Sequence, residues 1–147
     1  MVAVKYYDLE LAVEFASSEG FDTSAYVCPV TGKTYFVSSE MKEEELEDNP
    51  DDLETSDRYL AVPTKKELEL GKPLVLSFIE DELPGDLDRV RDFFRKRGAY
   101  ARFKDLLDIR DAREKWYKYE EAATRTALRL WCEENGLELS FEEAGPA

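Results

Sequence analysis

One long amphipathic helix is the element that most strongly constrains the fold of this chain. It is predicted from about Asp111 to Asn135, where apolar residues recur at intervals of three and four, as they do on one face of a helix. Asn135 and Gly136 end the pattern, since both residue types adopt the left-handed backbone of a helix C-terminus. The stripe expected to face the core comprises Trp116, Tyr119, Ala123, Ala127, Leu130 and Trp131.

Shorter helices are predicted ahead of this one. Thr64 stands three residues before Glu67, the spacing of a capping box, and this predicts a short helix closed by Gly71 and Pro73. A second helix is expected within residues 73–83, where apolar residues again recur at helical intervals, namely Leu76, Ile79 and Leu83.

A turn is expected at Pro84 and Gly85, after which Asp86 can cap a helix that extends to about residue 97. Its apolar face comprises Leu87, Val90 and Phe94. Gly98 is expected to end that helix, a role of its backbone alone. The helical pattern restarts over residues 99–111, with an apolar face made of Phe103, Leu106 and Leu107.

The N-terminal part predicts a helix followed by strands. Residues 6–17 carry apolar side chains at helical spacing, and this helix is expected to stop near Gly20. Two β-prone runs then flank a Pro-Val-Thr-Gly turn and predict a hairpin. Residues 58–63 predict a third strand, and residues 137–141 a short edge strand. The expected fold class is therefore α+β: a small antiparallel sheet, a hairpin plus one strand, with a helix-rich C-terminal half.

At 147 residues the chain has the size of one domain, and a single domain over residues 1–147 is expected. Residues 38–57 are densely acidic, contain Pro50 and have few bulky apolar side chains. Such a segment cannot bury enough apolar surface to order itself, so a flexible acidic insert is predicted. A calcium site is the alternative, although the segment does not match the spacing of a calcium-binding loop.

The residue types present exclude several kinds of enzyme. No histidine occurs, which excludes Ser-His and Cys-His nucleophile pairs and histidine-ligated zinc. The chain has neither a glycine-rich phosphate loop nor metal-ligand spacing, so no cofactor and no metal are expected. Neighbouring carboxylates keep an enzyme conceivable, but in so acidic a chain such pairs are uninformative. Cys28 and Cys132 are expected to be buried, reduced thiols. We expect a protein that is not an enzyme.

The formal net charge of −14 repels nucleic acid and membrane surfaces at long range. No run of about 18 apolar residues is present, so no membrane-spanning helix is expected. The N-terminus lacks the basic start and apolar run of a signal peptide. A cytoplasmic location is therefore predicted.

Basic residues nevertheless gather in one stretch, Arg-Lys-Arg-Gly-Ala-Tyr-Ala-Arg-Phe-Lys-Asp, over residues 95–105. Phe103 is assigned to the core as a helix-face residue, and Tyr117 is the best candidate for an exposed contact on the last helix. The basic side chains of residues 95–105 could bind phosphates while an aromatic ring stacks on a base. Alternatively, acidic residues of the same chain could neutralise them. The candidate binding surface comprises Arg97, Tyr100, Arg102, Lys104 and Tyr117.

The same region resembles the C-terminal part of an uncharacterised bacterial protein family, known by its provisional number zero-one-five-eight. That family has a Gly-Ala-Phe-x-Arg-Phe-Lys-Asp segment, followed by a helix with an early Trp, a later Trp-Leu and a closing Glu-Glu-Asn-Gly. Tyr100 stands where the family has Phe, and Cys132 where Leu is common. The resemblance is strongest over residues 86–137 and implies no assigned activity. The matching residues are Gly98, Ala99, Arg102, Phe103, Lys104, Asp105, Trp116, Trp131, Glu134, Asn135 and Gly136.

Taken together, these patterns favour a cytoplasmic protein-binding or adaptor module with an unidentified protein partner. The alternative is association with nucleic acid or ribonucleoprotein through the basic residues 95–104. The two hypotheses predict different effects of salt. Binding to phosphates weakens steeply as salt is added, whereas binding through apolar surfaces depends far less on salt.

Overall fold

The structure, a computed structural model, describes residues 1–18 and 22–141, so the helix stop expected at Gly20 lies outside the described residues. The chain divides into two compact units. The sheet unit comprises Met1–Leu68 and Arg125–Ala147, and the helical unit comprises Glu69–Thr124. Helix α6, Arg113–Glu134, contributes residues to both. The prediction of one domain over the whole chain stays a prediction.

The sheet unit contains the expected antiparallel sheet, and the α+β fold class is confirmed. Strands β2 (Thr23–Val27) and β3 (Thr34–Ser38) form the hairpin, and β4 (Leu60–Ala61) pairs with the other edge of β2. Gly32 lies in the hairpin turn with a φ of +78°, a conformation that glycine adopts without strain.

A second sheet joins the two ends of the sheet unit. Strand β1 (Val2–Lys5) pairs in parallel with β5 (Leu137–Ser140), with Val4 opposite Leu139. The edge strand near the C-terminus was predicted, whereas β1 was not. Strand β1 leads directly into a helix that begins at Tyr6, so no turn residues separate it from the helix and mark it as a strand.

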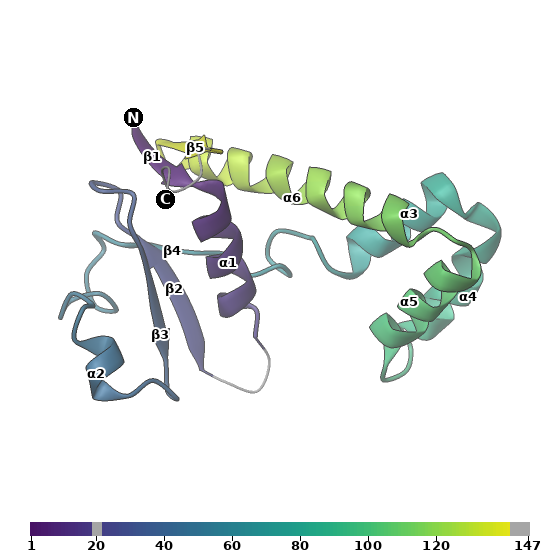
Figure 1. Cartoon of the computed structure of the whole chain (residues 1–147), viewed down its shortest axis with the longest axis horizontal. Coiled ribbons are helices and arrows are strands. Elements are labelled where there is room, and N and C mark those ends of the chain that lie inside the picture. Colours follow the sequence, from purple (N-terminus) through teal and green to yellow (C-terminus); the bar gives the residue numbers. More distant parts are fainter. Residues whose placement is uncertain (19–21, 142–147) are drawn as a thin grey trace, which may run out of the picture. The chain divides into compact units, whose positions relative to one another are not determined.

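Helix α1 (Tyr6–Ala16) lies alongside β2 and β3 and covers the core of the sheet unit, as Figure 1 shows. The prediction of an opening helix is confirmed. From α6, this core receives Leu128 and Cys132, one turn apart, while Leu130 is 52% exposed. The predicted stripe on α6 is therefore wrong at Leu130, because it assumed one apolar face along the whole helix.

The helical unit consists of α3 (Lys72–Glu82), the short 3-10 helix η1 (Pro84–Asp86), α4 (Leu87–Phe93), α5 (Ala99–Ile109) and the first half of α6. The expected core face of α5 is confirmed, since its three predicted residues are buried. On α3 the buried stripe is shifted from the predicted one. It comprises Leu74, Val75, Phe78 and Ile79, whereas Leu76 and Leu83 are half-buried.

Two predicted helix starts differ in the structure. The capping box forms, because the Thr64 hydroxyl accepts a bond from the Glu67 amide and the Glu67 carboxylate accepts one from the Thr64 amide. It opens only a turn, since Glu69 has a φ of +58°, which does not continue a helix. At the start of α4, Asp86 makes no capping bond, because Arg110 occupies both of its carboxylate oxygens.

The acidic stretch over residues 38–57 contains a short helical turn, α2 (Glu43–Leu46). Leu53 is buried, and the Asn49 side chain donates a hydrogen bond of 2.9 Å to the carbonyl oxygen of Phe36. These contacts attach parts of the stretch to the sheet unit. Its flexibility stays a prediction.

Candidate functional site

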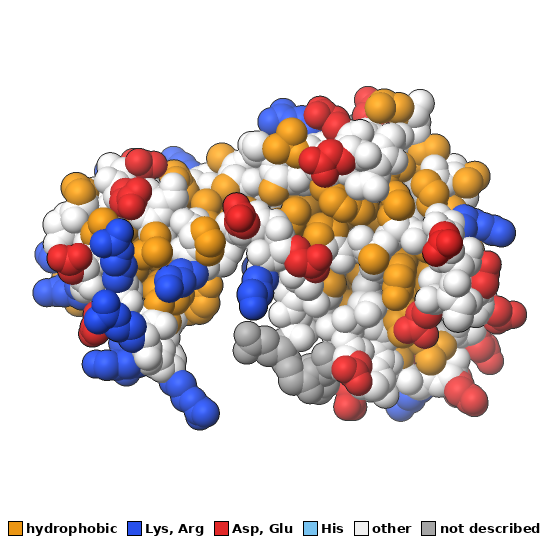
Figure 2. Space-filling model, turned by 180° about the vertical axis from the view of Figure 1, so that it is seen from behind, with side chains coloured by type: hydrophobic (Ala, Val, Ile, Leu, Met, Phe, Trp, Pro, Cys, Tyr) orange, Lys and Arg blue, Asp and Glu red, His pale blue; other side chains and the backbone are white. Residues whose placement is uncertain are grey.

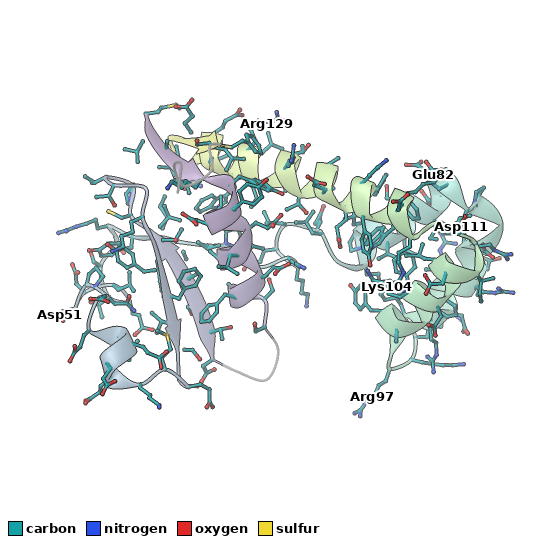
Figure 3. The ribbon with its side chains drawn as sticks, viewed as in Figure 1. Asp51, Glu82, Arg97, Lys104, Asp111 and Arg129 are labelled. Carbon is teal, nitrogen blue, oxygen red and sulfur yellow. The ribbon has the colours of Figure 1, made fainter. Side chains whose placement is uncertain are left out.

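All five candidate residues lie in the helical unit, on α5, on α6 and in the turn before α5. Figure 3 shows Arg97 at the tip of that turn and Lys104 on the side of α5 toward α6. Gly98 precedes α5 with a φ of +79°, which accords with the backbone role expected of it. Helix α4, however, already ends at Phe93, so Gly98 starts a helix rather than ending one.

The candidate residues form two groups rather than one patch. Arg102 folds back on the turn, where its Nη1 donates a hydrogen bond of 2.9 Å to the carbonyl oxygen of Arg97. Tyr100 and Lys104 are four residues apart and therefore share another face of α5. The Lys104 Nζ lies 4.6 Å from the centroid of the Tyr117 ring on α6, a cation–π contact.

Two residues that the sequence analysis did not single out extend the second group. The rings of Phe94 and Tyr100 meet edge to face, with centroids 5.3 Å apart. Lys72 is the first residue of α3, and its Nζ lies 5.9 Å from the centroid of the Phe94 ring. These contacts join Lys72, Phe94 and Tyr100, and the pair of Lys104 and Tyr117 follows one turn farther along α5. We call this set of residues the cation–aromatic ribbon, comprising Lys72, Phe94, Tyr100, Lys104 and Tyr117.

A tight ion pair borders the ribbon. Arg113 donates hydrogen bonds of 2.7 and 2.8 Å to the two carboxylate oxygens of Asp108, and one of 3.1 Å to the Tyr117 hydroxyl. These bonds hold the pKa of Asp108 below its ordinary value and that of Arg113 above its own. Asp108 lies one turn beyond Lys104 on α5, and its carboxylate is already occupied by Arg113.

The lysines of the ribbon are not neutralised in the same way. Within residues 1–18 and 22–141, no carboxylate oxygen lies within 4.0 Å of the Nζ of Lys72 or Lys104. The same holds, in those ranges, for the guanidinium groups of Arg97 and Arg102. These four cations are thus able to accept carboxylates or phosphates from a partner.

The core of the helical unit holds the ribbon in place. Phe103 and Trp116 are buried next to Lys104 and Tyr117 in the chain, and their rings meet edge to face at 4.9 Å. Trp116 also contacts Phe78 of α3, with centroids 5.3 Å apart. The expectation that Phe103 belongs to the core is confirmed. In contrast, Tyr100 and Tyr117 are 50% and 44% exposed.

Charge is distributed very unequally between the units. The helical unit carries twelve basic and thirteen acidic residues, and the sheet unit eight basic and twenty-one acidic ones. The net charge of the chain therefore arises almost entirely from the sheet unit. Figure 2 shows several Lys and Arg side chains gathered over the helical unit.

A smaller group of cations and rings occurs in the sheet unit. The Lys33 Nζ lies 5.2 Å from the centroid of Tyr35, and the Arg58 guanidinium 5.8 Å from that of Tyr59. The two tyrosine rings meet edge to face at 6.2 Å. This group lies on β3 and just ahead of β4, and was also missed from the sequence. Because it also has two cations in contact with aromatic rings, this group can serve as a control when the cations of the ribbon are replaced.

Both cysteines are buried and free, as expected. The described residues contain no group of three or more Cys, Asp or Glu side chains placed to hold a metal ion. Among the helices of the described part of the chain, none is both long and apolar enough to cross a membrane.

Comparison with known protein families identifies a relationship over nearly the whole chain. The model of an uncharacterised protein family, UPF0158, matches residues 6–146. The chain belongs to the UPF0158 family. The resemblance noted over residues 86–137 is therefore confirmed and extends to the N-terminal part. Searches of curated proteins and of solved structures gave no match. Membership of UPF0158 assigns no activity, so the function has to be argued from the surface just described.

Proposed function

We propose that this UPF0158 protein is a non-enzymatic, cytoplasmic binding or adaptor protein, which contacts a protein partner through its helical unit. The observation that carries the proposal is the exposure of Tyr100 and Tyr117 on helices that also place Phe103 and Trp116 in the core. Tyrosine and arginine are enriched among the residues that contribute most to protein interfaces. A tyrosine held by a rigid helix loses little side-chain entropy on binding.

The arrangement of the aromatic rings favours a protein partner over nucleic acid. Single strands bind by stacking bases on open ring faces. Lys104 already covers one face of Tyr117, and the edge-to-face contact with Phe94 restricts the ring of Tyr100. What these tyrosines present is their exposed ring edges, together with the Tyr117 hydroxyl, which suit polar and apolar groups of a protein.

The placement of the cations supports the same choice. Affinity for nucleic acid depends mainly on contacts of Lys and Arg with the phosphate backbone. The four cations named above do not form one patch: Lys72 starts α3, Arg97 lies in the turn before α5, and Arg102 and Lys104 lie on different faces of α5. Asp88 and Asp92 lie nearby and pair with Arg91 and Lys96, which reduces the positive field further.

The proposal is tested by affinity purification of the tagged, full-length protein from lysate of the native cell, with nuclease added throughout. The double variant Tyr100→Ala, Tyr117→Ala is compared with Tyr7→Ala, Val30→Ala, which removes two exposed apolar side chains of the sheet unit. We expect a defined set of proteins to be retained by the wild type and by the control, and reduced at least ~10-fold by the tyrosine variant, as for loss of an interface hot spot.

Equal retention by both double variants, judged by quantitative mass spectrometry, would show that the helical unit is not the binding surface. Recovery of nucleic acid alone when nuclease is omitted would favour the alternative function. Circular dichroism of each variant checks that the fold is intact, since all four substituted side chains are exposed.

A further inference from the structure

From the ribbon we infer the chemistry of the partner: the cation–aromatic ribbon binds an extended, carboxylate-rich protein segment. This inference rests on the proposed function and specifies the partner that the surface would take. It follows from three properties of the ribbon, namely its unpaired lysines, the Tyr117 hydroxyl and the order in which its residues follow one another from α3 to α6.

The lysines provide the charge complementarity. Lys72 and Lys104 stand at the start of α3 and midway along α5, and the two aromatic residues Phe94 and Tyr100 lie between them. Both ammonium groups lack a carboxylate within 4.0 Å in the part of the chain described. An ammonium group has three N–H donors, and those that do not face the ring can donate to a partner.

The neighbouring carboxylate is bound mainly by another cation. Asp108 attracts Lys104 but accepts its two short hydrogen bonds from Arg113, and its oxygens lie more than 4.0 Å from the Lys104 Nζ. Arg113 in turn donates to the Tyr117 oxygen, which leaves the hydroxyl hydrogen of Tyr117 free to donate to an incoming acceptor. The end of the ribbon at α6 therefore presents an ammonium and a phenol hydrogen together.

The linear order of the ribbon indicates an extended ligand. Lys72 contacts Phe94, Phe94 contacts Tyr100, and Lys104 lies one turn beyond Tyr100 on α5, so acidic side chains would contact the two lysines while the residues between them pack on the two rings. A segment with carboxylates interrupted by other residues fits this order. The near-neutral helical unit, with twelve basic against thirteen acidic residues, opposes such a segment much less than the sheet unit does.

Fluorescence anisotropy of the full chain with labelled probes tests the inference. The acidic probe is a fluorescein-labelled peptide of ten alternating Glu-Gly repeats, and its control has Gln in place of Glu. A labelled oligouridylate of equal charge represents nucleic acid. At 50 mM NaCl the acidic peptide is expected to bind, and the Gln peptide is expected to bind at least ~10-fold more weakly. Added salt is expected to weaken the complex with the acidic peptide.

Paired variants locate the site. Lys72→Gln, Lys104→Gln removes the two ribbon cations, and Lys33→Gln, Arg58→Gln removes the two ring-bound cations of the sheet unit, with the same change in charge. The ribbon variant is expected to weaken peptide binding at least ~10-fold and the matched variant less than ~2-fold, since screened distant charges contribute little. Equal loss in both would overturn the inference, because the attraction would then be general.

Two further results would also overturn it. Tighter binding of oligouridylate with the same dependence on Lys72 and Lys104 would assign the ribbon to nucleic acid. Absence of binding to every probe would show that the partner is not recognised by its carboxylates. In the latter case the tyrosine-dependent retention of proteins from lysate would still hold, so failure of the inference is distinguishable from failure of the proposed function.

Discussion

Arg110 holds the carboxylate of Asp86 with two hydrogen bonds of 3.0 Å each, one from Nε and one from Nη2. The pair joins the end of α5 to the 3-10 turn that precedes α4. Asp86 is one of the few buried polar residues, only 7% exposed. A buried carboxylate is stable only when it is paired, so Arg110 determines whether this turn keeps its geometry.

Replacing Asp86→Asn is therefore expected to lower the free energy of unfolding by about 1–3 kcal/mol, the range for hydrogen bonds to charged groups. Urea denaturation followed by circular dichroism measures the change. Asp88→Asn is the control, because Asp88 pairs with Arg91 at 3.8 Å and its side chain is fully exposed. The control should change the free energy of unfolding much less than Asp86→Asn, because exposed ion pairs contribute little. Equal losses would mean that the Asp86 pair has no special role.

The same pair makes a pH-dependent contribution to stability. The hydrogen bonds from Arg110 hold the pKa of Asp86 below its ordinary value of 3.8. The carboxylate therefore stabilises the fold fully above pH 3.8, and this stabilisation is lost as the pH falls through the lower folded-state pKa. We expect the stability difference between the wild type and Asp86→Asn to be constant from pH 7 to 5 and to shrink below pH 4. A difference that grows on acidification would contradict this sign.

A close backbone approach makes Gly32 irreplaceable in the hairpin turn. A Cβ at this position would lie 2.1 Å from the carbonyl oxygen of Ala3, in addition to the strain of a φ of +78°. Gly32→Ala is expected to destabilise the protein by about 3 kcal/mol or more. Gly136→Ala is matched in backbone, with a φ of +71°, but has nothing within 4 Å. It should cost only about 1–2 kcal/mol in the same urea titration; similar losses would show that the contact with Ala3 is unimportant.

The two cysteines should differ in reactivity. Burial raises the pKa of the Cys132 thiol to about 11, whereas a hydrogen bond from Thr31 lowers the pKa of the Cys28 thiol. At pH 8 we expect iodoacetamide to modify Cys28 at least ~10-fold faster than Cys132, because the thiolate is the reactive form. Peptide mapping by mass spectrometry gives the two rates. The difference should vanish in 8 M urea; comparable rates in the native protein would refute the assignment.

Local helical patterns were predictable from sequence, and pairings between distant segments were not. The core face of α5 follows from a period of three and four residues, which Phe103, Leu106 and Leu107 display directly. Leu130 on α6 was misassigned because the two halves of that helix pack into different units, a property that no local period encodes. Strand β1 was missed for a related reason: its partner β5 lies at the other end of the chain.

The candidate site was predictable in part for similar reasons. Tyr100 and Lys104 were indicated by the basic stretch, and Tyr117 was indicated as the best candidate for an exposed contact on the last helix. Lys72 lies on α3 and Phe94 directly follows α4, so only the fold places them in the ribbon. Asp86 has the residue type and position of a helix cap, yet a side chain 24 residues away competes successfully for its carboxylate.

Site-specific photo-cross-linking tests most directly whether a protein partner binds the helical unit. The full-length protein would carry p-benzoylphenylalanine at Tyr100, at Tyr117 or, as the control, at Tyr7, all three of which are exposed. Illumination of living cells that express these variants is expected to cross-link the first two positions to the same defined protein and to leave Tyr7 without that product. Cross-links to nucleic acid alone at Tyr100 and Tyr117, or the same products at all three positions, would contradict the proposed function.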